Sequence, residues 1–173
     1  MQIRKLTPDD AAVLKAIRLE AVQDSPPSFM PNAEEVRARS IESFSQLLSD
    51  PQDAVYGVFV EAELIAIAGL RKNCAAKLKH KANIFGVYTQ AAQRKKGIAR
   101  RLLLTLLDDA YSDPHIVQIT LSVNIENKSA KALYYALGFE LYGFEKNAML
   151  VDGVFVHEEH LVLYVLDRIE LPN

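Results

Sequence analysis

The chain has 173 residues, of which half are hydrophobic and about a quarter charged, a composition typical of a globular protein that excludes collagen-like, coiled-coil and largely disordered chains. This length predicts a single domain that comprises residues 1–173. The formal net charge of −2 hides an asymmetry, because residues 71–101 contain ten Lys or Arg and no acidic residue, so that the rest of the chain carries about −12. Such a basic segment favours an anionic ligand.

Apolar segments are short, and cysteine is scarce. The longest apolar segments, 64–70 and 161–166, fall far below the roughly 20 residues that cross a bilayer, so no membrane partner is expected. The N-terminus lacks the apolar core of a secretory signal, and a lone cysteine, Cys74, cannot form an internal disulfide. We therefore expect a cytoplasmic protein in which Cys74 is a free structural cysteine.

Periodicity and end signals predict an α/β protein. Thr7 and Pro8 open a first helix, Pro51 stops a second, and Gly138 closes the last. The expected elements are, in chain order, a strand 2–6, helices 7–23 and 32–50, strands 54–60, 64–70 and 83–89, a helix 97–112, a strand 116–123, a helix 127–137, and two strands to about Leu166 around a turn at Asp152-Gly153. The order β-α-α-β-β-β-α-β-α-β-β predicts a mostly antiparallel mixed sheet flanked by about four helices.

The charged side chains near the ends of the helix that begins at Gly97 have the same sign as the helix dipole at each end. Three cations, residues 94–96, stand before its N-terminus, and Asp108 and Asp109 lie near its other end. An anion bound at the N-terminus would offset this unfavourable charge arrangement, because a helix N-terminus presents unpaired N–H groups. Gly97 and the small Ala99 let a phosphate approach the backbone closely. The pattern Arg-x-x-Gly-x-Ala is neither a Walker loop nor a dinucleotide fingerprint. The alternative to an anion site is a basic helix N-terminus that is simply exposed to solvent.

Two segments in this order resemble the GNAT superfamily of acyl-CoA-dependent N-acyltransferases, and the resemblance covers about residues 2–165. The strand Val87-Tyr88-Thr89, followed by Gln93-Arg94-Lys95-Lys96-Gly97-Ile98-Ala99, is similar to the family's strand and its pyrophosphate-binding Q/R-x-x-G-x-G/A segment. Residues 127–139, NKSAKALYYALGF, are similar to its N-x-x-A-x-x-x-Y-x-x-x-G-F segment. Ala99 and Ala91 replace a commoner glycine and proline, which we expect to alter loop stiffness.

The resemblance implies a GNAT-like fold and an N-acetyltransferase in which a primary amine attacks acetyl-CoA directly in a ternary complex. It implies a set of cofactor-binding residues: the strand backbone of Val87, Tyr88 and Thr89 for the pantetheine arm, the loop of Arg94, Lys95, Lys96, Gly97, Ile98 and Ala99 for the pyrophosphate, and Asn127. Simple N-capping is an equally good interpretation of Asn127.

Tyr134 is the predicted catalytic residue. When the tetrahedral intermediate collapses, coenzyme A leaves as a thiolate, which a phenol within hydrogen-bond reach can protonate. The tyrosine at this motif position often has that role in the family that the chain resembles. A core aromatic at helical spacing is the alternative, and Tyr135 is a weaker candidate on another face.

The sequence leaves the general base and the acceptor open. Glu61, His80, Glu158, Glu159 or a water chain could accept the proton of the amine. The acceptor is expected between the loop 24–31 and the hairpin turn at 152–153, and small amines, amino acids, antibiotics and protein amines all remain candidates. A homodimer is possible.

Other site classes are set aside. His157 and His160 flank two glutamates on an expected strand, where residues three apart point to opposite faces, so no metal is expected. The basic segment could contact nucleic-acid phosphates, but Phe85 and Tyr88 are its only aromatic residues, and no nucleic-acid partner is expected. A non-catalytic acyl-CoA sensor or phosphate-binding module on the same fold is the alternative to an enzyme.

Overall fold

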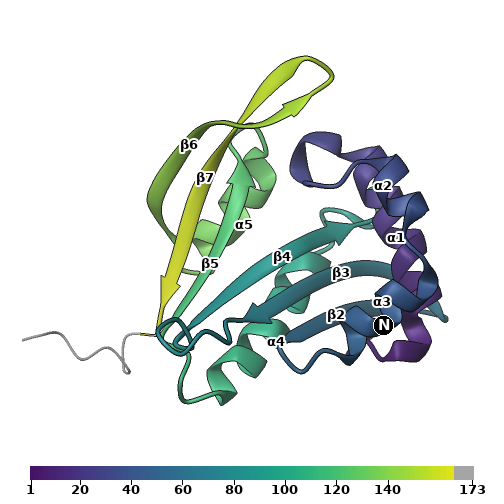
Figure 1. Ribbon diagram of the computed structural model, residues 1–173, viewed down its shortest axis with the longest axis horizontal. Coiled ribbons are helices and arrows are strands. Elements are labelled where there is room, and N and C mark those ends of the chain that lie inside the picture. The colour runs from purple at the N-terminus through teal and green to yellow at the C-terminus, as the bar shows by residue number, and fades with distance from the viewer. Residues whose placement is uncertain (166–173) are drawn as a thin grey trace, which may run out of the picture.

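The structure is a computed structural model that describes residues 1–165. Seven strands form one sheet in the order β1-β2-β3-β4-β5-β7-β6, in which β4 and β5 are parallel and every other pair is antiparallel (Figure 1). The predicted α/β class and mostly antiparallel mixed sheet are confirmed. The strands are β1 (Gln2–Lys5), β2 (Asp53–Val60), β3 (Glu63–Lys72), β4 (Lys81–Thr89), β5 (Gln118–Asn124), β6 (Glu140–Val151) and β7 (Val154–Tyr164).

The helices comprise longer α-helices and single 3-10 turns. The α-helices are α1 (Ala11–Asp24), α2 (Ala33–Ala38), α3 (Ile41–Ser49), α4 (Ile98–Ser112) and α5 (Lys128–Ala136), and the 3-10 turns are η1 (Pro8–Asp10), η2 (Pro26–Ser28) and η3 (Ala91–Gln93). No helix in residues 1–165 combines the length and the apolar character needed to cross a bilayer.

The single helix predicted over 32–50 is wrong, because the chain forms α2 and α3 instead. Ser40 interrupts the periodic pattern by capping α3, where its Oγ accepts a hydrogen bond from the Ser43 N–H at 3.2 Å. The carbonyls of Arg37 and Arg39 at the break accept hydrogen bonds from Lys15 Nζ of α1 at 3.0 and 2.6 Å. The described chain therefore has five α-helices rather than about four.

The C-terminal hairpin has the predicted turn. Asp152 and Gly153 adopt φ values of 48° and 80°, the left-handed pair that a tight two-residue hairpin turn requires. β7 lies between β5 and β6 in the sheet and ends at Tyr164. The expected strand end at Leu166 lies outside the described residues.

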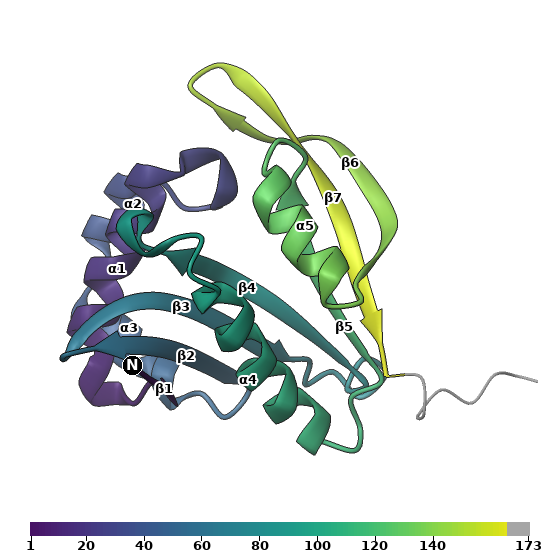
Figure 2. The same ribbon diagram turned by 180° about the vertical axis from the view of Figure 1, so that it is seen from behind.

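The sheet carries a separate core on each face. α4 and α5 cover one face, seen in front in Figure 2, and pack Leu102, Leu106 and Tyr134 against the strands. α1 and α3 cover β2, β3 and β4 on the other face, with Leu14 and Phe44 at the centre of that core.

β4 and β5 diverge soon after they begin. Their pairing extends only from Lys81–Asn83 to Gln118–Thr120, and from there β5 continues with β7 on its other side. β4 bends at a bulge at Gly86, which has a φ of 60° and falls where the register with β3 shifts. In both ribbon views the two strands open like the arms of a V. Among residues 1–165, the later part of β4 therefore has no neighbouring strand on the β5 side.

Two leucines of α4 provide a matched test of this packing. Leu106 is fully buried between α4 and the sheet, whereas Leu104 on the same helix is 36% exposed. We expect Leu106→Ala to lower the free energy of unfolding by about 2–5 kcal/mol, because it leaves a cavity in the core. Leu104→Ala should cost about 0.5 kcal/mol or less. Urea unfolding measures both, and equal costs would contradict the assigned orientation of α4.

Candidate active site

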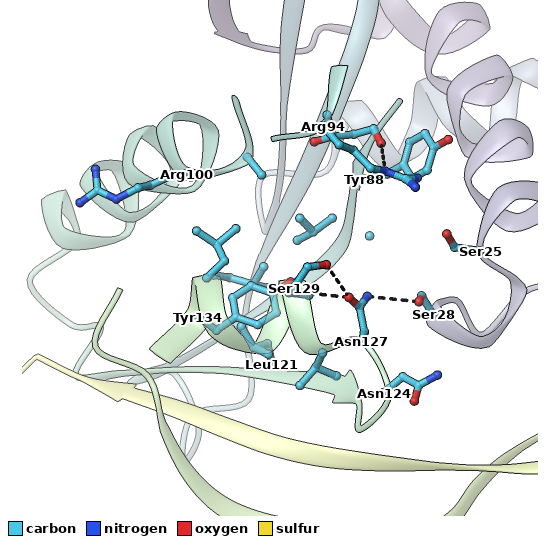
Figure 3. A pocket seen from close by; sticks show the side chains of 18 of the residues that line it. Ser25, Ser28, Tyr88, Arg94, Arg100, Leu121, Asn124, Asn127, Ser129 and Tyr134 are labelled. Carbon is cyan, nitrogen blue, oxygen red and sulfur yellow. Dashed lines mark hydrogen bonds between the residues drawn. The ribbon is translucent and has the colours of Figure 1, made fainter. Parts of the chain in front are cut away.

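A cavity of about 460 Å³ fills the opening between β4 and β5. It is lined by both strands, the N-terminal ends of α4 and α5, and the loop that follows α1 (Figure 3). Every predicted site residue except Lys96 lines it: Val87, Tyr88, Thr89, Arg94, Lys95, Gly97, Ile98, Ala99, Asn127 and Tyr134. Residues from distant parts of the sequence thus meet at one opening in the sheet.

The N-terminus of α4 presents unpaired backbone donors to this cavity. Lys95 and Gly97 both have left-handed backbones, with φ values of 62° and 73°, and Gly97 is an N-cap without a side chain. Within residues 1–165, the N–H groups of residues 95–100 donate no hydrogen bond. Consecutive free N–H groups at a helix start form a concave site for an anion. A Cβ on Gly97 would meet nothing within 4 Å, so the space before the helix is open.

Arg94 holds this loop against α1. Its Nε donates to the Thr89 carbonyl at 3.0 Å, its Nη2 forms an ion pair with Asp24, and its guanidinium lies 5.6 Å from the centre of the Tyr88 ring. The same ion pair lowers the pKa of the Asp24 carboxyl. Lys96 is also engaged, since its Nζ donates to Gln93 Oε1 at 2.9 Å. The free backbone N–H groups are therefore a more direct anion site than these two side chains.

The edge of β4 offers its backbone to the cavity, and a buried hydroxyl lies on the same strand. The Tyr88 side chain points to the α1 face, where its hydroxyl bonds to Glu20 at 3.0 Å and its ring packs on Phe29. Burial raises the pKa of Tyr88. Thr89 Oγ1 is buried and has no partner among the described residues. A buried unpaired hydroxyl beside a strand edge is suited to a ligand with amide groups.

Asn127 and its neighbour Asn124 connect the two sides of the opening. Asn127 caps α5 by accepting from the Ala130 N–H at 3.1 Å, and its Nδ2 donates to Ser28 Oγ at 3.5 Å (Figure 3). Asn124 Nδ2 donates to the Pro27 carbonyl at 3.2 Å. These contacts hold η2 across one end of the cavity. The N-capping interpretation of Asn127 is confirmed, and its contact with a cofactor stays a prediction.

Tyr134 belongs both to the core and to the cavity wall. It is 6% exposed and packs edge-on against Phe139, with the ring centres 5.9 Å apart. Its hydroxyl makes no hydrogen bond within the part of the chain that the structure describes. Burial raises its pKa, so the phenol stays protonated at neutral pH. Tyr135 instead points toward β7, where its hydroxyl donates a hydrogen bond to Glu159 Oε2 at 2.9 Å.

Most of the expected general bases lie away from the cavity. Glu61 sits in the β2–β3 turn, and His80 lies where β4 and β5 are still paired, its carbonyl accepting from the Val117 N–H. Glu159 is bound by Lys131 at 2.7 Å, which lowers the pKa of its carboxyl. Glu158 is on the face of β7 opposite to Glu159, and burial raises the pKa of its carboxyl.

Sequence reasoning missed a hydrogen-bonded chain beside the cavity. Ser122, a cavity-lining residue of β5, has its Oγ 2.9 Å from His160 Nδ1 on β7, and His160 Nε2 lies 3.1 Å from Glu145 Oε2 on β6. The three residues lie on the sheet face opposite α4 and α5, because Leu121 and Leu161 beside them point into the α4 core. No spacing along the sequence predicts these hydrogen bonds, because they depend on β7 lying between β5 and β6 in the sheet.

The histidines and acidic residues of the described chain are not arranged as a metal site. In residues 1–165 no set of three or more His, Cys, Asp or Glu side chains is placed to hold a metal ion. His157 and His160 point to different partners, because His157 Nδ1 accepts from the Asn147 N–H at 2.9 Å.

Comparison with known proteins agrees with this geometry. Residues 3–159 match the family model described as Acetyltransferase (GNAT) domain. The chain is 30% identical over 112 residues to "N-alpha-acetyltransferase RimI" of Mycobacterium tuberculosis, covering 64% of this chain and 67% of that protein.

Solved structures share the fold. An acetyltransferase of the GNAT family from Streptococcus pneumoniae superposes with a TM-score of 0.86 at 18% identity, covering 95% of this chain and 99% of that one. The yncA protein of Salmonella typhimurium, solved with its cofactor acetyl-CoA, has a TM-score of 0.84 at 19% identity, with 100% and 98% covered. With the family model spanning most of its length, the chain belongs to the GNAT family of acyl-CoA-dependent N-acetyltransferases, whose acetyl donor is acetyl-CoA.

Proposed function

We propose that the cavity binds acetyl-CoA with its pyrophosphate at the N-terminus of α4 and its pantetheine arm along β4. The observation that carries this proposal is the run of unpaired N–H groups of residues 95–100, which opens onto the unpaired edge of β4. The arm extends β4 as an added strand would, and Thr89 lines the cavity beside it. The thioester then lies deep in the opening, near Gly86 and Tyr134.

The reaction is direct transfer from the thioester to an amine. The amine nitrogen forms a bond to the acetyl carbonyl carbon, and a backbone N–H of β4 stabilises the oxyanion of the tetrahedral intermediate. The C–S bond then breaks, and coenzyme A leaves as a thiolate. Tyr134 donates a hydrogen bond to the developing thiolate, for which its protonated phenol is suited.

The proton of the amine leaves through Ser122. Ser122 Oγ receives the proton as it passes its own to His160 Nδ1, and Glu145 accepts the hydrogen bond from the other ring nitrogen of the resulting imidazolium. Glu145 and Glu158 place negative charge around this imidazolium, and the Tyr142 ring packs on it at 6.0 Å. This hydrogen-bonded path takes the place of the general-base candidates that the sequence left open.

The acceptor is an amine that reaches the thioester from the α1 face. The name of the mycobacterial relative, N-alpha-acetyltransferase, favours an α-amine, and the acidic groups near His160 favour a cationic acceptor. We further propose that residues 1–173 form one domain that works in the cytoplasm. Homodimerisation stays a prediction.

A panel of amines tests the activity. With acetyl-CoA and primary amines that include amino acids, short peptides and diamines, we expect release of free thiol that depends on the amine. Tyr134→Phe should lower kcat by about 10²-fold or more with little change in acetyl-CoA affinity, because it removes the donor to the leaving thiolate. Tyr135→Phe is the matched control and should stay near the original rate. No amine-dependent thiol release would reject the enzyme and favour the sensor.

Two substitutions at one glycine test the pyrophosphate site. Gly97→Glu places bulk and negative charge in the open space before α4 and should weaken acetyl-CoA binding at least tenfold, about 1.4 kcal/mol. Gly97→Asn is the control, because asparagine tolerates the φ of 73° and adds no charge. Calorimetric titration with acetyl-CoA measures both. Undiminished affinity in Gly97→Glu would place the pyrophosphate elsewhere.

The proton path is tested by substitution. Ser122→Ala and His160→Gln should both lower kcat/KM for the amine, because each interrupts the path from the amine to the imidazole. His157→Gln, on the other side of the strand, is the matched control and should keep the original rate. If Glu158→Gln lowers kcat/KM and His160→Gln does not, the base is Glu158.

A further inference from the structure

Arg18 on α1 is a buried cation with two nitrogens that make no hydrogen bond to the described residues. Its Nε and Nη2 atoms are buried, and neither has a hydrogen-bond partner within residues 1–165. The guanidinium lies 5.5 Å from the centre of the Phe85 ring. Burial, together with the charges of Arg39 and Arg71, lowers the pKa of Arg18 to about 10. Since a buried unpaired charge is costly, these nitrogens indicate a missing anionic partner.

The surroundings of Arg18 hold too little negative charge to neutralise it. Arg71 takes both oxygens of the buried Asp53 carboxylate, at 2.7 and 2.6 Å, and lies over the Phe85 ring at 5.1 Å. Arg39 lies over a different ring at 4.6 Å and forms no ion pair with another described residue. We call Arg18, Arg39 and Arg71 the arginine cluster. The acidic group that acts on Arg18 is therefore Asp53, which is already bound by two hydrogen bonds, and Asp50 acts on Arg71.

The arginine cluster adjoins the place where the thioester is expected. A Cβ on Gly86 would lie 3.4 Å from Arg18 Nη2, so Arg18 reaches the bulge of β4. Phe85 and Gly86 both line the cavity. Phe85 packs with the α1 core, so the cluster lies on the α1 face of the sheet, as Ser122 does. Arg18 itself does not line the cavity, but it contacts Phe85 and Gly86, which do, so a group held by Arg18 would be on the acceptor side of the opening.

We propose that the arginine cluster binds the carboxylate of the acceptor through Arg18, so that the acceptor is a free amino acid with its α-amine next to its carboxylate. This inference rests on the proposed function. A carboxylate is planar and matches the two parallel donors of a guanidinium edge. An α-amino acid separates its amine from its carboxylate by one carbon, which fits the short path from Arg18 to Gly86. A peptide N-terminus has an amide there, and it would leave the buried charge unneutralised.

Amino acids and their α-amides compared pairwise test the proposal. The probes are the common L-amino acids and the corresponding amino-acid amides, assayed for thiol release from acetyl-CoA with the full chain. For the best amino acid, kcat/KM should exceed that of its amide by about 10- to 100-fold, the value of a hydrogen bond to a charged group. Arg18→Gln should reduce this ratio to near one without weakening acetyl-CoA binding. Lys5→Gln, which removes an exposed cation on β1, should leave the ratio unchanged.

Stability separates a ligand site from a structural arginine. Arg18→Met keeps the volume of the side chain and removes an unpaired buried charge, so its Tm without ligand should equal or exceed the original. A lower Tm would show that Arg18 serves the fold and would overturn the proposal. The proposal would also be overturned if amides or peptides had a kcat/KM as high as that of amino acids, or if diamines were the sole acceptors. Either result would leave the proposed acetyl transfer intact. If no amine releases thiol, the proposed function fails and this inference fails with it.

Discussion

The short parallel pairing of β4 with β5 is the constraint on which the rest of the structure depends. Three residues of each strand pair, and beyond them the bulge at Gly86 turns β4 away while β7 keeps β5 on a different course. A sheet that stayed closed would satisfy the backbone of β4 and leave no room for a ligand. Because it opens, a strand edge, the buried hydroxyl of Thr89 and a helix N-terminus lie close together, and none of them has a partner among the residues that the structure describes.

The opening divides the chemistry between two faces of the sheet. On the α4 and α5 face, the free N–H groups before α4 and the phenol of Tyr134 suit a phosphate and a departing thiolate. On the α1 face, Ser122 with His160 suits the proton of an amine, and Arg18 suits an anion. The thioester is the natural meeting point, because the cavity passes between the strands and is lined from both sides.

The basic segment of the sequence turns out to have several structural roles. Arg71 and Lys72 pair with Asp53 and Asp113, and Arg94 pairs with Asp24 on α1, so these cations fix loops and strand ends. The proposed pyrophosphate site depends more on backbone geometry than on net charge. A left-handed residue at Gly97 exposes N–H groups that an ordinary capping side chain would occupy. The composition predicted an anionic ligand, which agrees with the acetyl-CoA that the family uses, and three of the cations are held in ion pairs within the protein.

The sequence by itself determined the element types, the hairpin turn at Asp152-Gly153, the helix start at Gly97 and the two motifs, because each follows from local periodicity or backbone preference. It missed the break at Ser40, where a capping hydroxyl overrode a continuous apolar pattern. Only the tertiary structure decided which strands are neighbours. His160 meets Ser122 because β7 lies between β5 and β6, and Arg18 meets Gly86 because α1 crosses β4. Such contacts join residues far apart in the chain, and no spacing along it records them.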